Sequence, residues 1–259
     1  MPPPQRSLSV RNSPLVHIDG KAIMRLLLRG FRCKELVTAA RDGFTLTELL
    51  VSLALISVVA AVVTAPVVNA RNKARRARCT ANLEQVSKAV LGFCEDHNKT
   101  LPAPQAGVQG DLSWWYKEQV KSYAGLKEPS SPSDSVFACP DDRSYSDPKP
   151  FSQTARFDYG SYSFNGLTLP GVPSIAGWAL SAIRNPRKTL LVMEWSAHAP
   201  LSWHNSRTGK KNAPFYRDAE NVVSFIDGHV SFIKIYYDGY NAAYTQDPIP
   251  GYDYQYSGE

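Results

Sequence analysis

The residues that could catalyse a reaction or bind a metal ion are not spaced as an active site or a metal site requires. Glu194 and His198 lie four residues apart, but Pro200 and the strand-forming residues nearby disfavour a pairing on one helix. The other candidates are scattered and show neither zinc-finger nor metalloprotease spacing: His97, His204 and His229. We therefore expect no catalytic residue, no metal ion and no cofactor.

A single carboxylate stands within a long apolar run. Between Phe44 and Val68 the only charged residue is Glu48, and the 20 residues of Leu49–Val68 are uncharged. As a helix they would span about 30 Å, which matches the apolar core of a bilayer; a buried helix of a soluble core is the alternative. A carboxylate in a membrane helix costs roughly 2.5–3.5 kcal/mol at the centre and less near the end. Glu48 therefore needs a cationic partner or a position at the head groups.

The net charge of +6 is unevenly distributed along the chain. Residues 1–43 carry +5, residues 44–78 carry +4 and residues 79–259 carry −3. Residues 79–259, the larger part of the chain, are mildly acidic, which argues against a basic nucleic-acid-binding domain. No nucleic acid partner is therefore expected. A basic stretch before an apolar helix holds the N-terminus in the cytoplasm. We expect a single-pass membrane protein whose C-terminal part lies on the outer side of the membrane.

An amphipathic helix is predicted to continue the apolar one. Apolar positions recur there at steps of four and three residues, which is the period of one helix face: Cys79, Leu83, Val86, Val90, Phe93 and His97. We predict one helix over residues 44–98, ending before Leu101-Pro102. Its first half, residues 44–68, is expected to be transmembrane, and its second half, residues 69–98, to be amphipathic.

Residues 99–259 are predicted to form a β-rich globular domain. The clearest unit consists of Asn221–Ile226 and His229–Ile235, joined by Asp227-Gly228. Two β-rich runs with such a link indicate a tight hairpin, whose turn would need positive φ at both central residues. Thr189–Met193 reads as a further strand. The predicted fold class is α+β, with the long N-terminal helix packed on an antiparallel sheet.

The start of the apolar run resembles the prepilin motif of type IV pilins and type II secretion pseudopilins. Gly43, Phe44 and Glu48 match it, after a basic leader that begins at Met1 or Met24. The resemblance implies a pilin-like fold and cleavage by a prepilin peptidase between Gly43 and Phe44. It also implies methylation of the new amine of Phe44, which would meet Glu48 of a neighbouring subunit during assembly.

Further segments resemble the bacterial prepilin-type processing-associated family, named for a His followed nine residues later by Asp-Gly. The nearest matching residues are His204, Asp227 and Gly228, with 13 additional residues between the His and the Asp-Gly. The resemblance gives these three residues no defined role. The other similar segments are Ala77–Gln85, Leu101-Pro102, Phe137–Asp141, Gly160–Tyr162, Lys188-Thr189 with Glu194, and Phe225–Val230.

The four cysteines allow one preferred disulfide once the leader is set aside with Cys33. Cys79 and Cys94 lie 15 residues apart on the predicted helix, about 22 Å, which is too far to bridge. Any disulfide must therefore use Cys139. We prefer Cys79–Cys139 because both lie in segments that resemble the family, and three reduced cysteines are the alternative.

The sequence as a whole indicates a non-enzymatic structural subunit of a type IV pilus or a type II secretion-type filament. Its expected partners are prepilin peptidase, other pilin or pseudopilin subunits and membrane lipid. A membrane-tethered extracytoplasmic binding protein that does not polymerise is the alternative. A tethered enzyme using His198, His204 or Glu194 is the third reading.

Overall fold

The computed structural model describes most of the chain after residue 42. The described residues are 43–105, 114–145, 148–199, 201–204, 219–236, 244 and 246–259, without the side chains of residues 62–66. The leader expected at residues 1–43 therefore lies outside the described residues, apart from Gly43. The chain divides into two units, residues 1–58 and 59–259, and each is described by itself.

Helix α2 (Leu46–Asp96) has 51 residues and lies two residues inside each predicted end. The remaining helices are short. They comprise α3 (Tyr116–Val120), α4 (Trp195–His198) and five 3-10 turns: η1 (Lys121–Ala124), η2 (Ser135–Phe137), η3 (Phe151–Gln153), η4 (Ala155–Phe157) and η5 (Leu180–Ala182).

The described helices do not include the predicted membrane span. Among the residues that the structure describes, no helix is both long enough and apolar enough to cross a membrane. The transmembrane half predicted at residues 44–68 is therefore not found among them.

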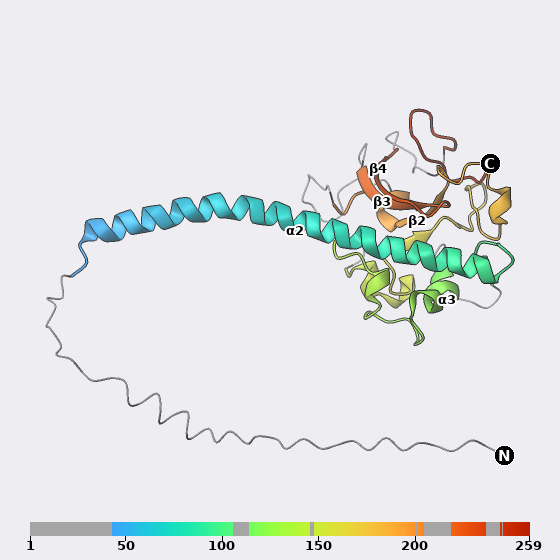
Figure 1. Cartoon of the computed structure of the whole chain (residues 1–259), viewed down its shortest axis with the longest axis horizontal. Coiled ribbons are helices and arrows are strands. Elements are labelled where there is room, and N and C mark those ends of the chain that lie inside the picture. Colours follow the sequence, from blue (N-terminus) through green and yellow to red (C-terminus); the bar gives the residue numbers. More distant parts are fainter. Residues whose placement is uncertain are drawn as a thin grey trace, which may run out of the picture. The chain divides into compact units, whose positions relative to one another are not determined.

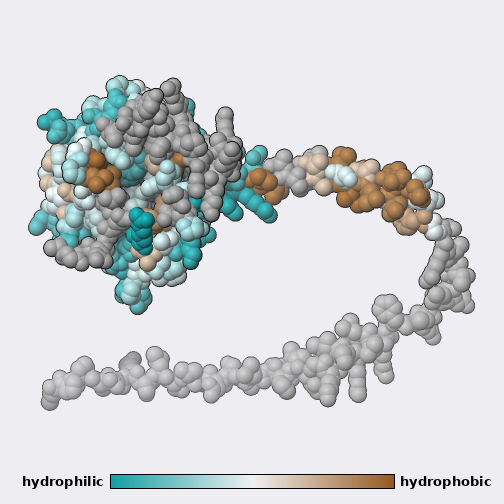
Figure 2. Space-filling view, turned by 180° about the vertical axis from the view of Figure 1, so that it is seen from behind, coloured by the Kyte–Doolittle hydropathy of each residue, from teal (hydrophilic) through white to brown (hydrophobic). Residues whose placement is uncertain are grey.

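In the first unit, most side chains of α2 are apolar, and all of them are exposed. Leu49, Leu50 and Val51 follow one another around the helix and are 53%, 56% and 68% exposed. Because successive residues are about 100° apart on a helix, these three already cover more than one face. Figure 2 shows the resulting apolar surface along the beginning of the helix. This part of α2 has no polar side turned to water as an amphipathic helix would.

In the second unit, four antiparallel strands form one sheet, as the predicted fold class requires. The strands are β1 (Tyr162–Phe164), β2 (Leu190–Glu194), β3 (Ala219–Phe225) and β4 (Val230–Ile235). They lie in the order β1-β2-β3-β4, so neighbours in sequence are neighbours in the sheet. The second half of α2 lies beside this sheet, and α3 lies beside the same helix (Figure 1).

Each face of the sheet packs against a different part of the chain. Leu191 and Val222 join the core formed with α2, whose predicted apolar stripe is buried from Cys79 to Phe93. The alternate residues Leu190 and Val223 join a second core. That second core includes two tyrosines of the C-terminal tail, Tyr254 and Tyr256. Both faces of β2 are thus buried, which explains its continuous apolar sequence.

The predicted hairpin is present, but its turn differs from the prediction. β3 and β4 pair in register from Ala219–Ile235 to Ser224–Val230. The Gly228 N–H donates to the Phe225 carbonyl at 2.9 Å, and only Gly228 of the turn has positive φ, at 90°. The connection is therefore a three-residue loop with one glycine in the left-handed region. The prediction of positive φ at both Asp227 and Gly228 was wrong.

Candidate functional site

The predicted processing residues lie together at the start of α2. The Thr45 hydroxyl accepts a hydrogen bond from the Glu48 backbone N–H at 3.2 Å. In return, Oε2 of Glu48 accepts hydrogen bonds from the Thr45 backbone N–H at 2.9 Å and from its hydroxyl at 2.8 Å. This reciprocal arrangement is a capping box, which satisfies N–H groups that a helix start leaves free. This capping role of Glu48 was not predicted, although the Thr-x-x-Glu spacing is typical of a capping box.

Gly43 and Phe44 have no packing role among the described residues. A Cβ added at Gly43 would meet no described atom within 4 Å, and its φ is not positive. The Phe44 side chain is 84% exposed. Among the described residues, the fold therefore places no requirement on either residue type.

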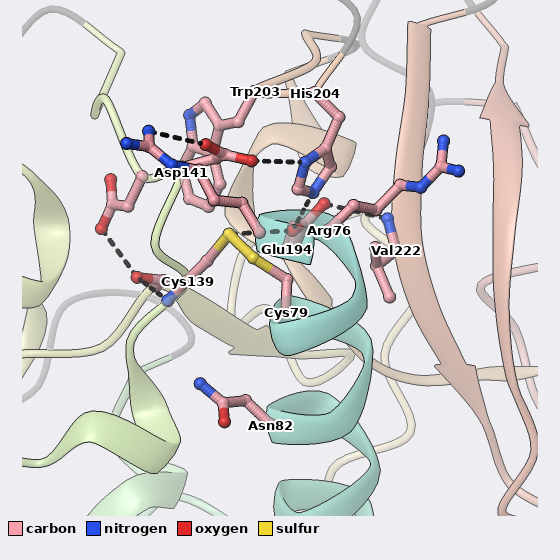
Figure 3. The surroundings of a disulfide bond; sticks show 12 residues. Arg76, Cys79, Asn82, Cys139, Asp141, Glu194, Trp203, His204 and Val222 are labelled. Carbon is pink, nitrogen blue, oxygen red and sulfur yellow. Dashed lines mark hydrogen bonds and ion pairs between the residues drawn. A yellow bond between two sulfur atoms is a disulfide. The ribbon is translucent and has the colours of Figure 1, made fainter. Parts of the chain in front are cut away.

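A second cluster surrounds a disulfide in the globular unit. Cys79 of α2 and Cys139 form the bond, with Cα atoms 4.9 Å apart (Figure 3). This is the pair that the sequence favoured. Cys94, further along α2, is a buried free cysteine. The disulfide links α2 to the chain 60 residues later, so it ties the helix to the loop before the sheet.

Asn82 holds the Cys139 loop against α2. It lies on the helix one turn after Cys79, and its side-chain N–H groups donate to the carbonyls of Ser135 at 2.9 Å and Ala138 at 2.8 Å. The Asn82 residue is 8% exposed, so both carbonyls are paired within the protein rather than by water. This contact gives Asn82 a structural role next to Cys79, because its side chain fixes the loop that carries Cys139.

The first strand completes the support of the disulfide. The Ser161 hydroxyl accepts a hydrogen bond from the Cys139 N–H at 3.0 Å, and the next residue, Tyr162, donates its hydroxyl to the Cys79 carbonyl at 3.2 Å. Ser161 in turn donates to the Asp142 carboxylate at 2.7 Å. Three segments separated in sequence, around residues 79, 139 and 161, therefore converge on one bond.

His204 bridges two carboxylates beside the disulfide (Figure 3). Its Nδ1 lies 3.0 Å from Oδ2 of Asp141, and its Nε2 lies 2.7 Å from Oε1 of Glu194. The side chain is only 3% exposed. Burial lowers the pKa of His204, but the hydrogen bonds with Asp141 and Glu194 outweigh burial and raise the pKa to about 9. The imidazole is therefore positively charged at neutral pH.

Each of the two carboxylates has a further partner. Glu194, buried at the end of β2, accepts a hydrogen bond from the Val222 N–H through Oε2 at 2.9 Å. Asp141 lies 3.4 Å from the Arg75 guanidinium on α2. Burial raises the pKa of the Asp141 carboxyl, but hydrogen bonds with His204 and Arg75 lower it overall. The enclosed charges are thus paired, as buried charges must be to avoid a large desolvation cost.

Four residues with metal-ligating atoms meet at this point. The ligating atoms of Cys79, Cys139, Glu194 and His204 all lie within 4.8 Å of one another. In the disulfide state the two sulfurs are bonded to each other. The sequence did not reveal this set, because its four members come from separate segments and the sequence spacing drew attention to Glu194 with His198 instead.

The remaining predicted residues lie elsewhere. Asp227 and Gly228 form the β3–β4 turn, where Asp227 accepts a hydrogen bond from the His229 N–H at 3.1 Å. The described contacts do not join them to His204. His198 is buried with Nδ1 2.9 Å from the Ser163 hydroxyl, and burial lowers its pKa to about 4.

Comparison with known protein families supports the motif that the sequence predicts at the start of α2. Residues 39–64 match the model of the prokaryotic N-terminal methylation motif, the type IV pilin signal. The matched stretch contains Gly43, Phe44 and Glu48, so the chain carries this signal at the residues that the sequence indicated. No curated protein and no solved structure matches the chain.

Proposed function

We propose that the chain is a pilin-like structural subunit of a type IV pilus or a type II secretion-type filament. In this proposal, prepilin peptidase cuts between Gly43 and Phe44, and the new amine of Phe44 is methylated. The observation that carries the proposal is the N-terminal methylation motif at residues 39–64. The open space around Gly43 and the exposure of Phe44 support it, because an enzyme that reads both residues needs to reach them.

The exposed apolar start of α2 gives the subunit its anchor. Fully burying a Leu, Val or Ile side chain stabilises by about 1.5–3 kcal/mol, so these side chains favour a membrane or a bundle of like helices. We infer that the segment beginning at Phe44 lies in the inner membrane before assembly and against sister helices afterwards. Small residues along it, such as Ala54 and Ala60, allow close helix packing.

Glu48 can serve both its own helix and a neighbouring subunit. Among the described contacts, the capping box uses Oε2 of Glu48, which leaves Oε1 for a second partner. Cleavage after Gly43 creates a cationic amine on Phe44. Two opposite charges about 4 Å apart attract by roughly 4 kcal/mol at an effective dielectric constant near 20. This attraction offsets the cost of a carboxylate in an apolar setting and would fix the axial register of neighbouring subunits.

The globular unit is proposed to face the periplasm or cell surface and to have no catalytic role. A disulfide is typical of proteins on the oxidising side of the membrane, and Cys79–Cys139 supports that placement. His204 is enclosed and held by two carboxylates, and His198 is buried, which supports a structural role for both histidines.

Cells with and without prepilin peptidase test the proposal. With the peptidase, a shortened chain should appear in filaments that shearing removes from the cells. Without it, the uncut chain should remain in the membrane fraction. A shortened chain that neighbour cross-linking recovers only as a monomer would instead support the membrane-tethered binding protein. An uncut chain in cells that contain an active peptidase would contradict the proposed filament subunit.

A further inference from the structure

We propose that Cys79, Cys139, Glu194 and His204 form a zinc site when the disulfide is reduced. The site would take one Zn²⁺ with two thiolates, one carboxylate and one imidazole as ligands. These are the ligand types that zinc binds in proteins, and four protein ligands are typical of a structural zinc site. The metal would then replace the disulfide as the link between α2 and the Cys139 loop.

The ligating atoms need only small movements to reach a tetrahedral arrangement. With metal–ligand distances of about 2.0–2.3 Å, neighbouring ligands in a tetrahedral zinc site lie roughly 3.3–3.8 Å apart. The four ligating atoms here all lie within 4.8 Å of one another. Cys139 Sγ is already 3.3 Å from Glu194 Oε1, and His204 Nε2 is 2.7 Å from the same oxygen. Breaking the disulfide lets the sulfurs separate, and the metal takes the space between the four atoms.

The contacts behind these ligands are those of a metal site. A metal-bound histidine usually donates its other ring N–H to a carboxylate or carbonyl, which orients the ring and increases its basicity. His204 has such a partner, since Nδ1 lies 3.0 Å from Asp141 while Nε2 points at the cluster (Figure 3). Glu194 likewise presents Oε1 to the cluster, while its other oxygen is held by the Val222 N–H.

A pocket lies next to one member of the cluster. A pocket of about 270 Å³ is lined by His204 and by residues from one stretch of α2: Asn69, Asn72, Lys73 and Arg76. His204 is the member of the cluster that lines this pocket. Its side chain is 3% exposed, so the site would be closed to bulk water once the metal is bound.

The conversion balances in electrons and protons. A dithiol reductant transfers two electrons and two protons to the Cys79–Cys139 disulfide, which becomes two thiols, while the reductant becomes a disulfide. Zn²⁺ then displaces one proton from each thiol. It also displaces the proton that His204 shares with Glu194, so three protons leave for one metal ion. The disulfide and the zinc site are therefore mutually exclusive states of the same four residues.

Zinc binding by the full chain in detergent tests the inference. The chain should carry Cys33→Ser and Cys94→Ser, so that only the cluster provides thiols. After reduction with a dithiol, it should take one Zn²⁺ per chain from a chromophoric chelator, and Co²⁺ should give a thiolate charge-transfer band. The oxidised chain should bind at least about 100-fold more weakly, and Asp141→Asn should weaken binding by the reduced chain about 10- to 100-fold.

Two variants separate a ligand from a merely structural residue. His204→Ala should abolish tight zinc binding, whereas His198→Gln, at another buried histidine of the same unit, should leave it unchanged. Equal zinc affinity in the reduced and oxidised chains, or in the reduced parent and its His204→Ala variant, would overturn the proposal. So would a reduced chain that loses its near-ultraviolet circular dichroism and does not regain it when Zn²⁺ is added.

Discussion

The carboxylate of Glu48 and the backbone N–H of Thr45 are joined by a hydrogen bond of 2.9 Å at the first turn of α2. The residue for which we propose a role in subunit assembly therefore also caps its own helix. The two roles make different demands, because the cap needs both Thr45 and Glu48, whereas pairing with a neighbour's amine needs only the carboxylate.

Replacing Glu48 by Ala should prevent filament formation while leaving membrane insertion intact. The variant loses the attraction between the carboxylate and the neighbouring amine, so subunits should associate more weakly. The net loss is smaller than the roughly 4 kcal/mol of the pair, because Ala also avoids the cost of a carboxylate in an apolar setting. Filament yield in the sheared fraction and chain content of the membrane fraction are the two measurements.

Thr45→Ala is the matched control for the Glu48 variant. It removes the capping box, which is worth about 1 kcal/mol at the helix start, but keeps the carboxylate. Filaments should still form. If Thr45→Ala and Glu48→Ala lose filaments equally, capping explains the role of Glu48 and pairing with an amine does not.

Removing the disulfide should lower the free energy of unfolding of the oxidised, metal-free chain. The bond joins residues 60 positions apart, and replacing both Cys79 and Cys139 by Ser should cost about 2–4 kcal/mol. Chemical denaturation followed by tryptophan fluorescence measures the change. Cys94→Ser, at the buried free cysteine, is the comparison and should lower the free energy of unfolding clearly less. An equal loss would mean that the disulfide stabilises the chain only through the burial of its atoms.

Asn82→Ala should destabilise the globular unit by about 1–3 kcal/mol, because it leaves the carbonyls of Ser135 and Ala138 without their partner. Glu84→Ala is the control on the exposed side of the same helix. Its ion pair with Lys88, at 3.6 Å, should be worth less than about 0.5 kcal/mol. Thermal denaturation of both variants makes the comparison, and similar melting temperatures would argue against the Asn82 contact.

Local patterns in the sequence predicted the long helix α2 and the strands β2, β3 and β4, but not β1, the short helices or the cluster around the disulfide. The stripe from Cys79 to Phe93 and the strands around Asp227-Gly228 follow from periodicity and turn chemistry, which act over a few residues. The meeting of Glu194, His204 and Asp141 depends on how separate loops pack, and no spacing encodes that. The hairpin prediction failed only in its detail, because Asp-Gly fits both a two-residue turn and the three-residue loop that ends with Gly228.

The stability of the chain should fall on acidification through His198. Burial lowers its pKa to about 4, whereas the unfolded chain binds the proton near pH ~6.5. Between these values the unfolded state binds more protons, so the contribution is complete above pH ~6.5 and is lost as the pH falls to about 4, by up to about 3 kcal/mol. Denaturation midpoints across this range measure the slope.

A non-titrating variant checks that His198 is the source of this slope. His198→Gln should flatten the fall in stability between pH ~6.5 and ~4. His97→Gln, at an exposed histidine near the end of α2, is the comparison variant. A His198→Gln chain that loses stability as steeply as the parent would assign the acid sensitivity to other groups.

The most direct test of the proposed function is the mass of the native polypeptide recovered from its own cells. Mass spectrometry should find a mature chain that begins at Phe44 and carries one methyl group on its α-amine. Recovery of the native chain with residues 1–43 still attached would contradict the account, because no amine would then exist at Phe44 to meet Glu48.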